Sequence, residues 1–291
     1  MNTIAQDQDS PEFQRLLKAR QRVYSEATRY QILQLMLTVA LPVIGAVLAF
    51  SYSPARPYVA CYGLIATGLD AMWVDRMQRR LLKVAAKISE EFDCGVLKMQ
   101  WNAFVAGKRE DAEVVDAAAR RWNDAESGIK GWYTGISSAA EHPKARLVCQ
   151  RMNLQYDASL RKKYGAYLIC GAAVVLIALV LGAVAQDLRL LDFAAVATTV
   201  SPAIFWAVRE QFRQSDAAAA NETLKGEAEK FLDSVRTNGC DDAECEKRAR
   251  ELQDAIFQRR VSNPLVLPLV YRIMRNELEQ QAQAGADALL M

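Results

Sequence analysis

The apolar residues of this 291-residue chain gather into long uncharged blocks, which alternate with stretches dense in Lys, Arg, Asp and Glu. Two of these blocks, residues 30–55 and 164–186, contain no charged residue at all. A helix needs about 20 apolar residues to cross the hydrocarbon core of a bilayer, which is roughly 30 Å thick. The pattern therefore predicts membrane-spanning helices together with a soluble part, because a single globular core would spread its apolar residues along the chain.

Four blocks are predicted as membrane spans, arranged as two helical hairpins with short connections at 53–56 and 187–189. The second block, about 57–75, is interrupted by Asp70. The fourth, about 190–208, has Asp192 near its outer end, followed by 16 uncharged residues. A helix of that length covers about 24 Å, which is short but sufficient if the carboxylate of Asp192 reaches the interface.

Lys and Arg are concentrated at the same ends of all four predicted spans. Nineteen of them lie in the segments flanking those ends, whereas the two opposite loops hold only Arg56 and Arg189. Because loops rich in Lys and Arg stay in the cytoplasm, both termini are predicted to be cytoplasmic. The chain starts with polar and partly acidic residues, so no cleavable signal peptide is predicted and the first span is expected to be retained.

The other segments hold most of the chain and are predicted to form one helical cytoplasmic domain. The predicted fold class is thus an all-α membrane protein, with four transmembrane helices in two hairpins and a helical cytoplasmic domain. In chain order the parts are a cytoplasmic N-terminal helix (1–31), transmembrane hairpin 1 (32–75), a cytoplasmic helical insert (76–163), transmembrane hairpin 2 (164–208) and a cytoplasmic helical C-terminal region (209–291).

Apolar residues at helical spacing mark the helices of the C-terminal region. One face of residues 242–260 carries four small or apolar side chains, namely Cys245, Ala249, Leu252 and Ile256. The next helix is predicted to turn three side chains inward, namely Leu269, Ile273 and Leu278. The second and fourth spans are predicted to continue into the cytoplasm as unbroken helices, since no Gly or Pro follows them before Glu91 and Lys225 respectively.

Motifs for catalysis and metal binding are absent from the sequence. There is no Walker loop and no glycine-rich dinucleotide fingerprint. The single histidine, His142, argues against a hydrolytic triad and against a site with several histidine ligands. The chain is therefore predicted not to be an enzyme and to have no metal site.

Polar residues within the predicted spans are candidates for lining or gating a pore. An ionisable side chain at membrane depth is costly and usually faces a bundle interior or water, which favours a role for Asp70. The alternative is that Asp70 lies near the cytoplasmic interface and reaches into it. The hydroxyls of Thr198, Thr199 and Ser201 in the fourth span could line a water-filled path or simply pack one helix against another.

In the cytoplasmic segments, arginines alternate with aromatic residues. Arginine forks suit phosphates, and aromatic faces stack on nucleobases, so the set is a candidate site for a small nucleotide. The alternative is that each residue belongs to the hydrophobic core or to the signal that sets membrane topology. The residues of this set retained as ligand-binding candidates are Trp101, Trp132, Tyr133, Arg146, Arg151 and Arg161.

Two cytoplasmic motifs give the chain a family resemblance. Residues 92–102 read FDCGVLKMQWN, and residues 149–164 read CQRMNLQYDASLRKKY. In combination with two hairpins around an 88-residue insert, these motifs resemble the SMODS-associated four-transmembrane effectors of bacteria over essentially the whole chain. The motifs add Asn102 and Asn153 to the ligand-binding candidates, although the motif residues could equally form the hydrogen-bonded core that joins the insert to the third span.

The resemblance implies a pore-forming effector of cyclic-oligonucleotide antiphage signalling. A partner nucleotidyltransferase would make a cyclic nucleotide on infection, the cytoplasmic domain would sense it, and the membrane part would permeabilise the bacterial inner membrane. We expect a homo-oligomer in the lipid bilayer, with the cyclic oligonucleotide as activating ligand, no other cofactor, and no DNA or RNA polymer as partner. Two other functions stay open, a constitutive small ion channel or transporter and a non-conducting membrane scaffold.

Overall fold

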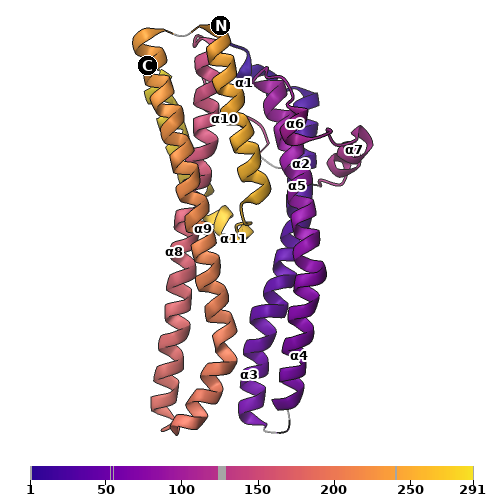
Figure 1. The fold of residues 1–291 in the computed structure, drawn as a ribbon, viewed down its shortest axis with the longest axis vertical. Helices are drawn as coiled ribbons and strands as arrows, with labels where there is room; N and C mark the ends of the chain where they lie inside the picture. The colour runs from indigo at the N-terminus through magenta and orange to yellow at the C-terminus, as the bar shows by residue number, and fades with distance from the viewer. Residues whose placement is uncertain (1, 53, 55, 124–128, 240, 291) are drawn as a thin grey trace. The chain divides into compact units, whose positions relative to one another are not determined.

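The computed structural model describes residues 2–52, 54, 56–123, 129–239 and 241–290. Over these residues the chain is helical and contains no strand, as predicted (Figure 1). The helices are α1 (Ile4–Asp7), α2 (Pro11–Leu35), α3 (Leu41–Ser51), α4 (Arg56–Leu69), α5 (Asp75–Val96), α6 (Ala103–Ala106), α7 (Ala112–Arg120), α8 (His142–Ala185), α9 (Leu190–Asn238), α10 (Asp242–Ser262) and α11 (Pro268–Leu290), with π-helical segments η1 (Met36–Ala40) and η3 (Asp70–Val74).

The chain packs into two units. One, here called the core unit, comprises Met1–Glu26, Arg80–Arg161 and Asp216–Met291. The other, the hairpin unit, comprises Ala27–Arg79 and Lys162–Ser215. Four helices, α2, α5, α8 and α9, each contribute residues to both units, so the chain passes from one to the other without leaving helical conformation.

The core unit has a hydrophobic centre built by long-range packing of helices that are far apart in sequence. Buried side chains from eight of the described helices meet in it, for example Leu17 of α2, Ile88 of α5, Leu147 of α8, Leu232 of α9 and Ile256 of α10. Because apolar burial is the main favourable term in folding, this cluster accounts for the cohesion of segments that the sequence separates by the two hairpins.

The helical pattern predicted for residues 242–260 is confirmed. Helix α10 runs from Asp242 to Ser262 and buries Cys245, Ala249, Leu252 and Ile256, the four predicted residues. Helix α9 is unbroken from Leu190 to Asn238, as predicted for the fourth span and its cytoplasmic continuation. The second span is likewise followed without a break by α5, through the π-helical segment η3.

The inward face predicted for α11 is wrong at two of its three positions. Leu269 and Ile273 are 69% and 66% exposed, whereas Leu278 is 1% exposed. The buried positions are Met274, Leu278, Ala282 and Ala286, which follow one another at intervals of four and so lie along one side of the helix. This stripe packs on Leu160 and on the hydrophobic core. Leu269 and Ile273, near the start of α11, lie outside it.

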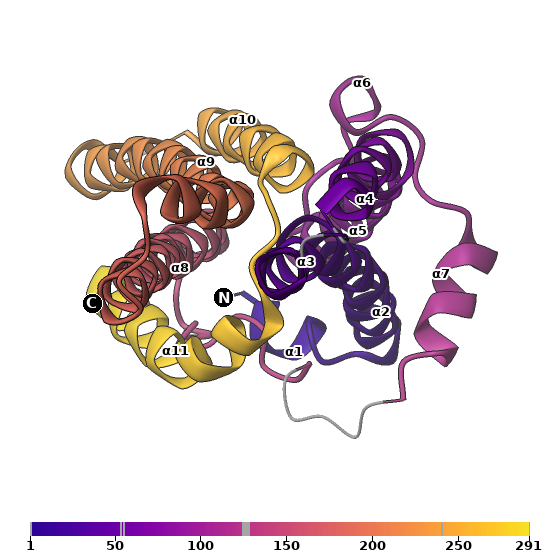
Figure 2. The same cartoon turned by 90° about the horizontal axis from the view of Figure 1, so that it is seen from below.

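In the hairpin unit, α3 lies against α4 (Figure 1). Helices α8 and α9 run side by side in both views (Figures 1 and 2). The second hairpin turns at 186–189, where Asp187 adopts a positive φ of 48°. In the first hairpin, Ser53 and Ala55 of the predicted connection lie outside the described residues.

Two of the described helices are long and apolar enough to cross a membrane, Pro11–Gly45 and His142–Ala185. They include the first part of the first predicted span and nearly all of the third. The second and fourth predicted spans are helical, as α4 with η3 and as the first part of α9, but several of their side chains, including that of Asp192, lie outside the described residues. The arrangement of four spans stays a prediction.

Candidate functional site

Two acidic side chains on the buried face of α5 form the centre of the candidate site. Glu90 and Asp93 are each 1% exposed, although α5 otherwise buries residues such as Ala86 and Phe92 along this face. Positions three residues apart lie on the same side of a helix, so both carboxylates enter the core together. Burying a carboxylate is costly unless it is paired and hydrogen-bonded, and α10 supplies the partners.

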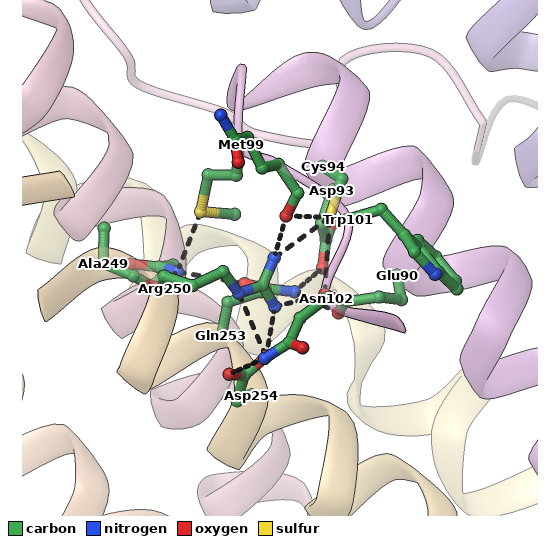
Figure 3. Close-up of polar contacts among 12 residues, drawn as sticks. Glu90, Asp93, Cys94, Met99, Trp101, Asn102, Ala249, Arg250, Gln253 and Asp254 are labelled. Atoms are coloured by element: carbon green, nitrogen blue, oxygen red, sulfur yellow. Dashed lines mark hydrogen bonds and ion pairs between the residues drawn. The ribbon is translucent and has the colours of Figure 1, made fainter. Parts of the chain in front are cut away.

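Arg250 of α10 is the main partner of Glu90, and lies at the centre of the polar contacts in Figure 3. Its Nη2 lies 2.5 Å from Oε1 of Glu90 and 2.7 Å from Oδ1 of Asp254. Its Nη1 donates to the carbonyl of Gln100, 2.8 Å away. Burial opposes the charge of Arg250, but the bond to Glu90 outweighs it and raises the pKa of the guanidinium above its ordinary value.

Asp93 accepts hydrogen bonds from a second set of donors. Arg260 Nη1 lies 2.5 Å from Oδ2 of Asp93, and the hydroxyl of Tyr133 donates to Oδ1 over 2.6 Å. Burial, reinforced by the charge of Asp93, raises the pKa of Tyr133 well above its ordinary value. The phenol therefore stays protonated at physiological pH and is a permanent hydrogen-bond donor to Asp93.

Gln253 and Gln150, both fully buried, connect these clusters to α8. The amide nitrogen of Gln253 donates to Glu90 over 2.8 Å and to Asp93 over 2.9 Å. The amide nitrogen of Gln150 donates to Oε1 of Gln253 over 3.0 Å and to the carbonyl of Ala249 over 2.8 Å. The buried network thus joins α5, α8 and α10 through groups whose hydrogen bonds are costly to leave unmade.

Trp101 and Asn102 of the ligand-binding candidates lie at the edge of this network. Asn102 caps α6 by accepting from the backbone nitrogen of Phe104, and its amide donates to Asp254 over 2.7 Å. The indole nitrogen of Trp101 donates to the carbonyl of Gly107, and the guanidinium of Arg109 lies 5.2 Å from its ring centroid. Asn102 therefore holds the 97–107 segment against α10, and Trp101 packs against the cluster formed by Ala86 of α5, Ala106 and Phe257 of α10.

Among the ligand-binding candidates, Tyr133 and Asn153 form a hydrogen bond with each other. The amide of Asn153 donates to the hydroxyl of Tyr133 over 3.1 Å. Trp132 lies beside them in sequence, and its ring packs edge-on against Phe92 and under the guanidinium of Arg20, which is 4.5 Å from the ring centroid.

The three arginine candidates lie in separate places on α8. Arg146 donates from Nε to the carbonyl of Leu97 over 2.9 Å, so this carbonyl, just after the end of α5, has a hydrogen-bond partner. Arg151 pairs with Glu229 of α9 at 2.6 Å. Arg161 pairs with Asp157 at 2.7 Å and also donates to the carbonyl of Pro264.

Each of the eight ligand-binding candidates therefore contacts other parts of the core unit. The sequence reasoning missed Glu90, Gln150, Arg250, Gln253 and Arg260. A signal exists for two of them, because Glu90 and Gln253 lie on the apolar stripes of their helices, each four residues after a buried alanine, Ala86 and Ala249 respectively. A polar residue on such a stripe requires a buried partner.

A cavity of about 430 Å³ lies between α8, α9 and α10 in the core unit, and no residue of the buried network or of the ligand-binding candidates lines it. Its apolar lining is formed by Leu147, Leu224, Ala228, Phe231, Leu252 and Ala255. Its charged lining is formed by Glu227, Lys230, Arg248 and Glu251. These four side chains are at least half exposed and pair within their own helices, Lys230 with Glu227 at 2.7 Å and Arg248 with Glu251 at 3.0 Å.

The pore or gating candidates lie in the hairpin unit. Asp70 is the first residue of η3, and both its carboxylate oxygens accept from the amide of Gln34, at 2.9 and 3.1 Å. Thr198 donates to the carbonyl of Ala194, and Ser201 donates to that of Thr198 over 2.9 Å, so both hydroxyls are used within α9. The side chain of Thr199 lies outside the described residues.

Within the described parts of the chain, no three His, Cys, Asp or Glu side chains come together in a way that could hold a metal ion. Glu90 and Asp93 instead take their charge compensation from Arg250 and Arg260.

Comparison with known proteins assigns the chain to a family. A family model described as the SMODS-associating 4TM effector domain matches residues 2–289, which include both units. The chain belongs to this family. The resemblance to SMODS-associated four-transmembrane effectors drawn from the two cytoplasmic motifs is thus confirmed.

A relative of this chain occurs in Bacillus cereus (strain VD146) and is named a probable CBASS effector molecule. It is 20% identical over 171 residues, which are 57% of each of the two chains. The chain therefore spans little more than half the length of the curated relative that it matches. No solved structure matches the chain.

Proposed function

We propose that this chain is a membrane effector that senses a cyclic oligonucleotide second messenger through its core unit and then permeabilises the bacterial inner membrane. The observation that carries the proposal is the family match over residues 2–289. The relative named a probable CBASS effector supports antiphage defence as the setting. Permeabilisation would end the infected cell before phage multiply, and a homo-oligomer would supply enough helices for a pore.

Exposed apolar side chains on all four helical arms of the hairpin unit support a membrane location. Large exposed apolar surfaces in a protein are normally covered by a partner or by lipid, and in lipid only helices or closed barrels satisfy the backbone. Exposed examples are Ile44 and Leu48 of α3, Ile65 and Leu69 of α4, Leu176 and Val184 of α8, and Leu191 and Phe205 of α9. We therefore infer that α4 and the first part of α9 cross the bilayer as well.

The π-helical segments favour the first hairpin as the place where a conducting path forms. Pro42 has no N–H to give to the carbonyl of Thr38, and the helix widens to η1 just before it. Widened turns of this kind occur frequently at functional sites. Because η3 begins at Asp70, which Gln34 holds by two hydrogen bonds, a polar pair lies between the two helices of an otherwise apolar hairpin.

The buried network offers a route from sensing to the membrane. Arg250 and Gln253 of α10 hold Glu90 and Asp93 of α5, and α5 continues through η3 into α4 of the first hairpin. A ligand that shifts α10 would thus act on a helix that belongs to both units. For this to activate the effector, the ligand must bind the open state more tightly than the closed one.

A test in cells joins the effector to its signal. The chain is expressed with a nucleotidyltransferase that makes cyclic oligonucleotides, or with a variant of that enzyme lacking its catalytic carboxylates, and entry of a membrane-impermeant dye is followed. We expect dye to enter only with the active enzyme. A constitutive channel would admit ions or dye with both enzymes and lose this on Asp70→Ala, and a non-conducting scaffold would admit dye with neither. Either of these results would overturn the proposal.

A further inference from the structure

The cavity between α8, α9 and α10 has the two kinds of surface that a nucleotide requires. Its apolar lining includes the ring of Phe231 and the aliphatic side chains of Leu147 and Leu252. Its charged lining includes the cations Lys230 and Arg248. A volume of about 430 Å³ falls within the common range for small-molecule sites, roughly 300–1,000 Å³.

We propose that this cavity binds the activating ligand. A nucleobase would pack against Phe231 and the neighbouring aliphatic side chains, and phosphates of the ligand would pair with Lys230 and Arg248. This assignment rests on the proposed function, because it takes the ligand to be a cyclic oligonucleotide. The cavity would hold part of the cyclic oligonucleotide. The rest of the ligand would lie at the open side of the cavity, beside the charged residues.

Lys230 and Arg248 can exchange their present glutamate partners for a phosphate. Lys230 and Arg248 each pair with a glutamate of their own helix, at 2.7 and 3.0 Å, and these pairs are largely exposed. Exposed ion pairs contribute little to stability, whereas an arginine fork on a phosphate is short and charge-assisted. A phosphate can therefore replace Glu251 on Arg248 at low cost.

The arginines of the ligand-binding candidates are less suited to this role. Arg151 bonds to Glu229 through two nitrogens, and Arg161 bonds to Asp157 and to the carbonyl of Pro264. Arg146 is 7% exposed and satisfies the carbonyls of Leu97 and Lys98. A phosphate that took any of these guanidinium groups would break at least two hydrogen bonds that are buried or partly buried, which is costly.

The position of the cavity also explains how a ligand would act on the network. Along α10, residues advance by about 100° each, so Arg248 and Leu252 face the cavity while Arg250 and Gln253 point to the other side. That other side holds Glu90 of α5 (Figure 3). In the end-on view α10 lies beside α9 with α8 nearby (Figure 2), so a ligand between them displaces α10 where it contacts α5.

The test is direct binding of cyclic di- and trinucleotides to the purified full-length protein in nanodiscs. The double variant Lys230→Ala with Arg248→Ala is compared with Arg236→Ala with Lys247→Ala, which removes the same charge from exposed positions of the same helices. A third variant, Ala255→Trp, fills the cavity and keeps both cations. Melting curves establish that each variant is folded.

We expect the nucleotide that binds wild type to bind the cavity double variant at least about tenfold more weakly, with the control double variant within about twofold of wild type. Ala255→Trp should bind as poorly as the cavity double variant. If the cavity double variant binds like wild type, the cavity assignment is overturned and the proposed function stands. If wild type binds no member of the panel, the proposed function and the cavity assignment fail together.

Discussion

At the residue scale, two arginines that lie two positions apart on α10 have different surroundings. Arg250 pairs with Glu90, a carboxylate that is 1% exposed, and with Asp254. Arg248 pairs with Glu251, and both side chains are at least half exposed. Their burial differs far more than their chemistry, so the two positions allow a matched comparison of a buried and an exposed ion pair.

We predict that Arg250→Ala destabilises the protein by about 3–5 kcal/mol, because it leaves the carboxylate of Glu90 buried without its cation. The control Arg248→Ala should cost about 0–1 kcal/mol. Thermal or denaturant unfolding of the purified protein, followed by circular dichroism, measures both. Equal effects of the two substitutions would show that Glu90 is not held as the structure has it.

His142, the single histidine of the chain, gives the stability a pH dependence in a range where no other side chain ordinarily titrates. It is the first residue of α8, and its Nε2 is buried with no hydrogen-bond partner in the part of the chain described. Burial, together with the charge of Arg146, lowers the pKa of His142 below its ordinary value. The folded protein therefore favours the neutral imidazole, and the unfolded chain binds more protons at mildly acidic pH.

The stabilisation from the neutral imidazole is complete above the ordinary pKa of about 6.5 and is lost as the pH falls through the lower value of the folded state. We predict that the melting temperature of wild type falls as the pH is lowered from about 7 to about 5, and that His142→Gln reduces this slope. Melting curves in one detergent across that range measure it. A slope that is the same in both proteins would rule out His142 as the titrating group.

Residue-level roles were predictable from the sequence only in part. The candidates Tyr133 and Arg146 were found because aromatic and basic residues are conspicuous, and Asn153 was found because it lies in a family motif. A sequence does not say whether such residues face a ligand or each other. Glu90 and Gln253 were missed because their partners lie about 160 positions away in the chain. Such pairing is decided by how the helices pack.

At the element scale, helix positions followed from hydrophobic periodicity wherever one apolar stripe was unambiguous, as in α10. Helix α11 offered two overlapping stripes, one starting with Leu269 and Ile273 and the other with Met274 and Leu278. The prediction combined Leu269 and Ile273 of the first stripe with Leu278 of the second, whereas packing on Leu160 buries only the second stripe. The segment just before the helix is held by hydrogen bonds from Arg161 to the carbonyl of Pro264 and from Asn263 to Asp157. These contacts join residues about a hundred positions apart, so no local pattern encodes them.

The register of α11 can be tested with two large-to-small substitutions on neighbouring turns. We predict that Leu278→Ala costs about 2–5 kcal/mol, the usual range for a buried leucine, since its side chain is 1% exposed. The control Ile273→Ala should stay within about 0.5 kcal/mol. Unfolding curves measure both. The opposite ranking would mean that Ile273, and not Leu278, faces the core.

At the scale of the whole molecule, the number of spans decides where the cytoplasmic insert lies. Four spans keep residues 76–163 in the cytoplasm with both termini, which agrees with the distribution of Lys and Arg. Two spans, formed only by the helices Pro11–Gly45 and His142–Ala185, would instead put that insert outside. The two arrangements therefore differ in the location of α7.

Cysteine labelling distinguishes these arrangements. We predict that a membrane-impermeant maleimide added to intact cells labels Arg189→Cys, in the outer turn of the second hairpin, and does not label Glu113→Cys on the exposed side of α7. The parent protein gives the background from its native cysteines. Labelling of Glu113→Cys from outside would contradict the four-span arrangement.

The central claim is that a cytoplasmic cyclic oligonucleotide opens a path through the membrane, and dye release from sealed liposomes tests it most directly. Purified full-length protein is reconstituted with an encapsulated fluorophore, and cyclic di- and trinucleotides are added one at a time, with the matching linear nucleotides as controls. The account predicts rapid release with at least one cyclic nucleotide, and none with the linear nucleotides or without ligand. Folded protein that releases no dye with any member of the panel, or that releases it equally without ligand, would contradict the account.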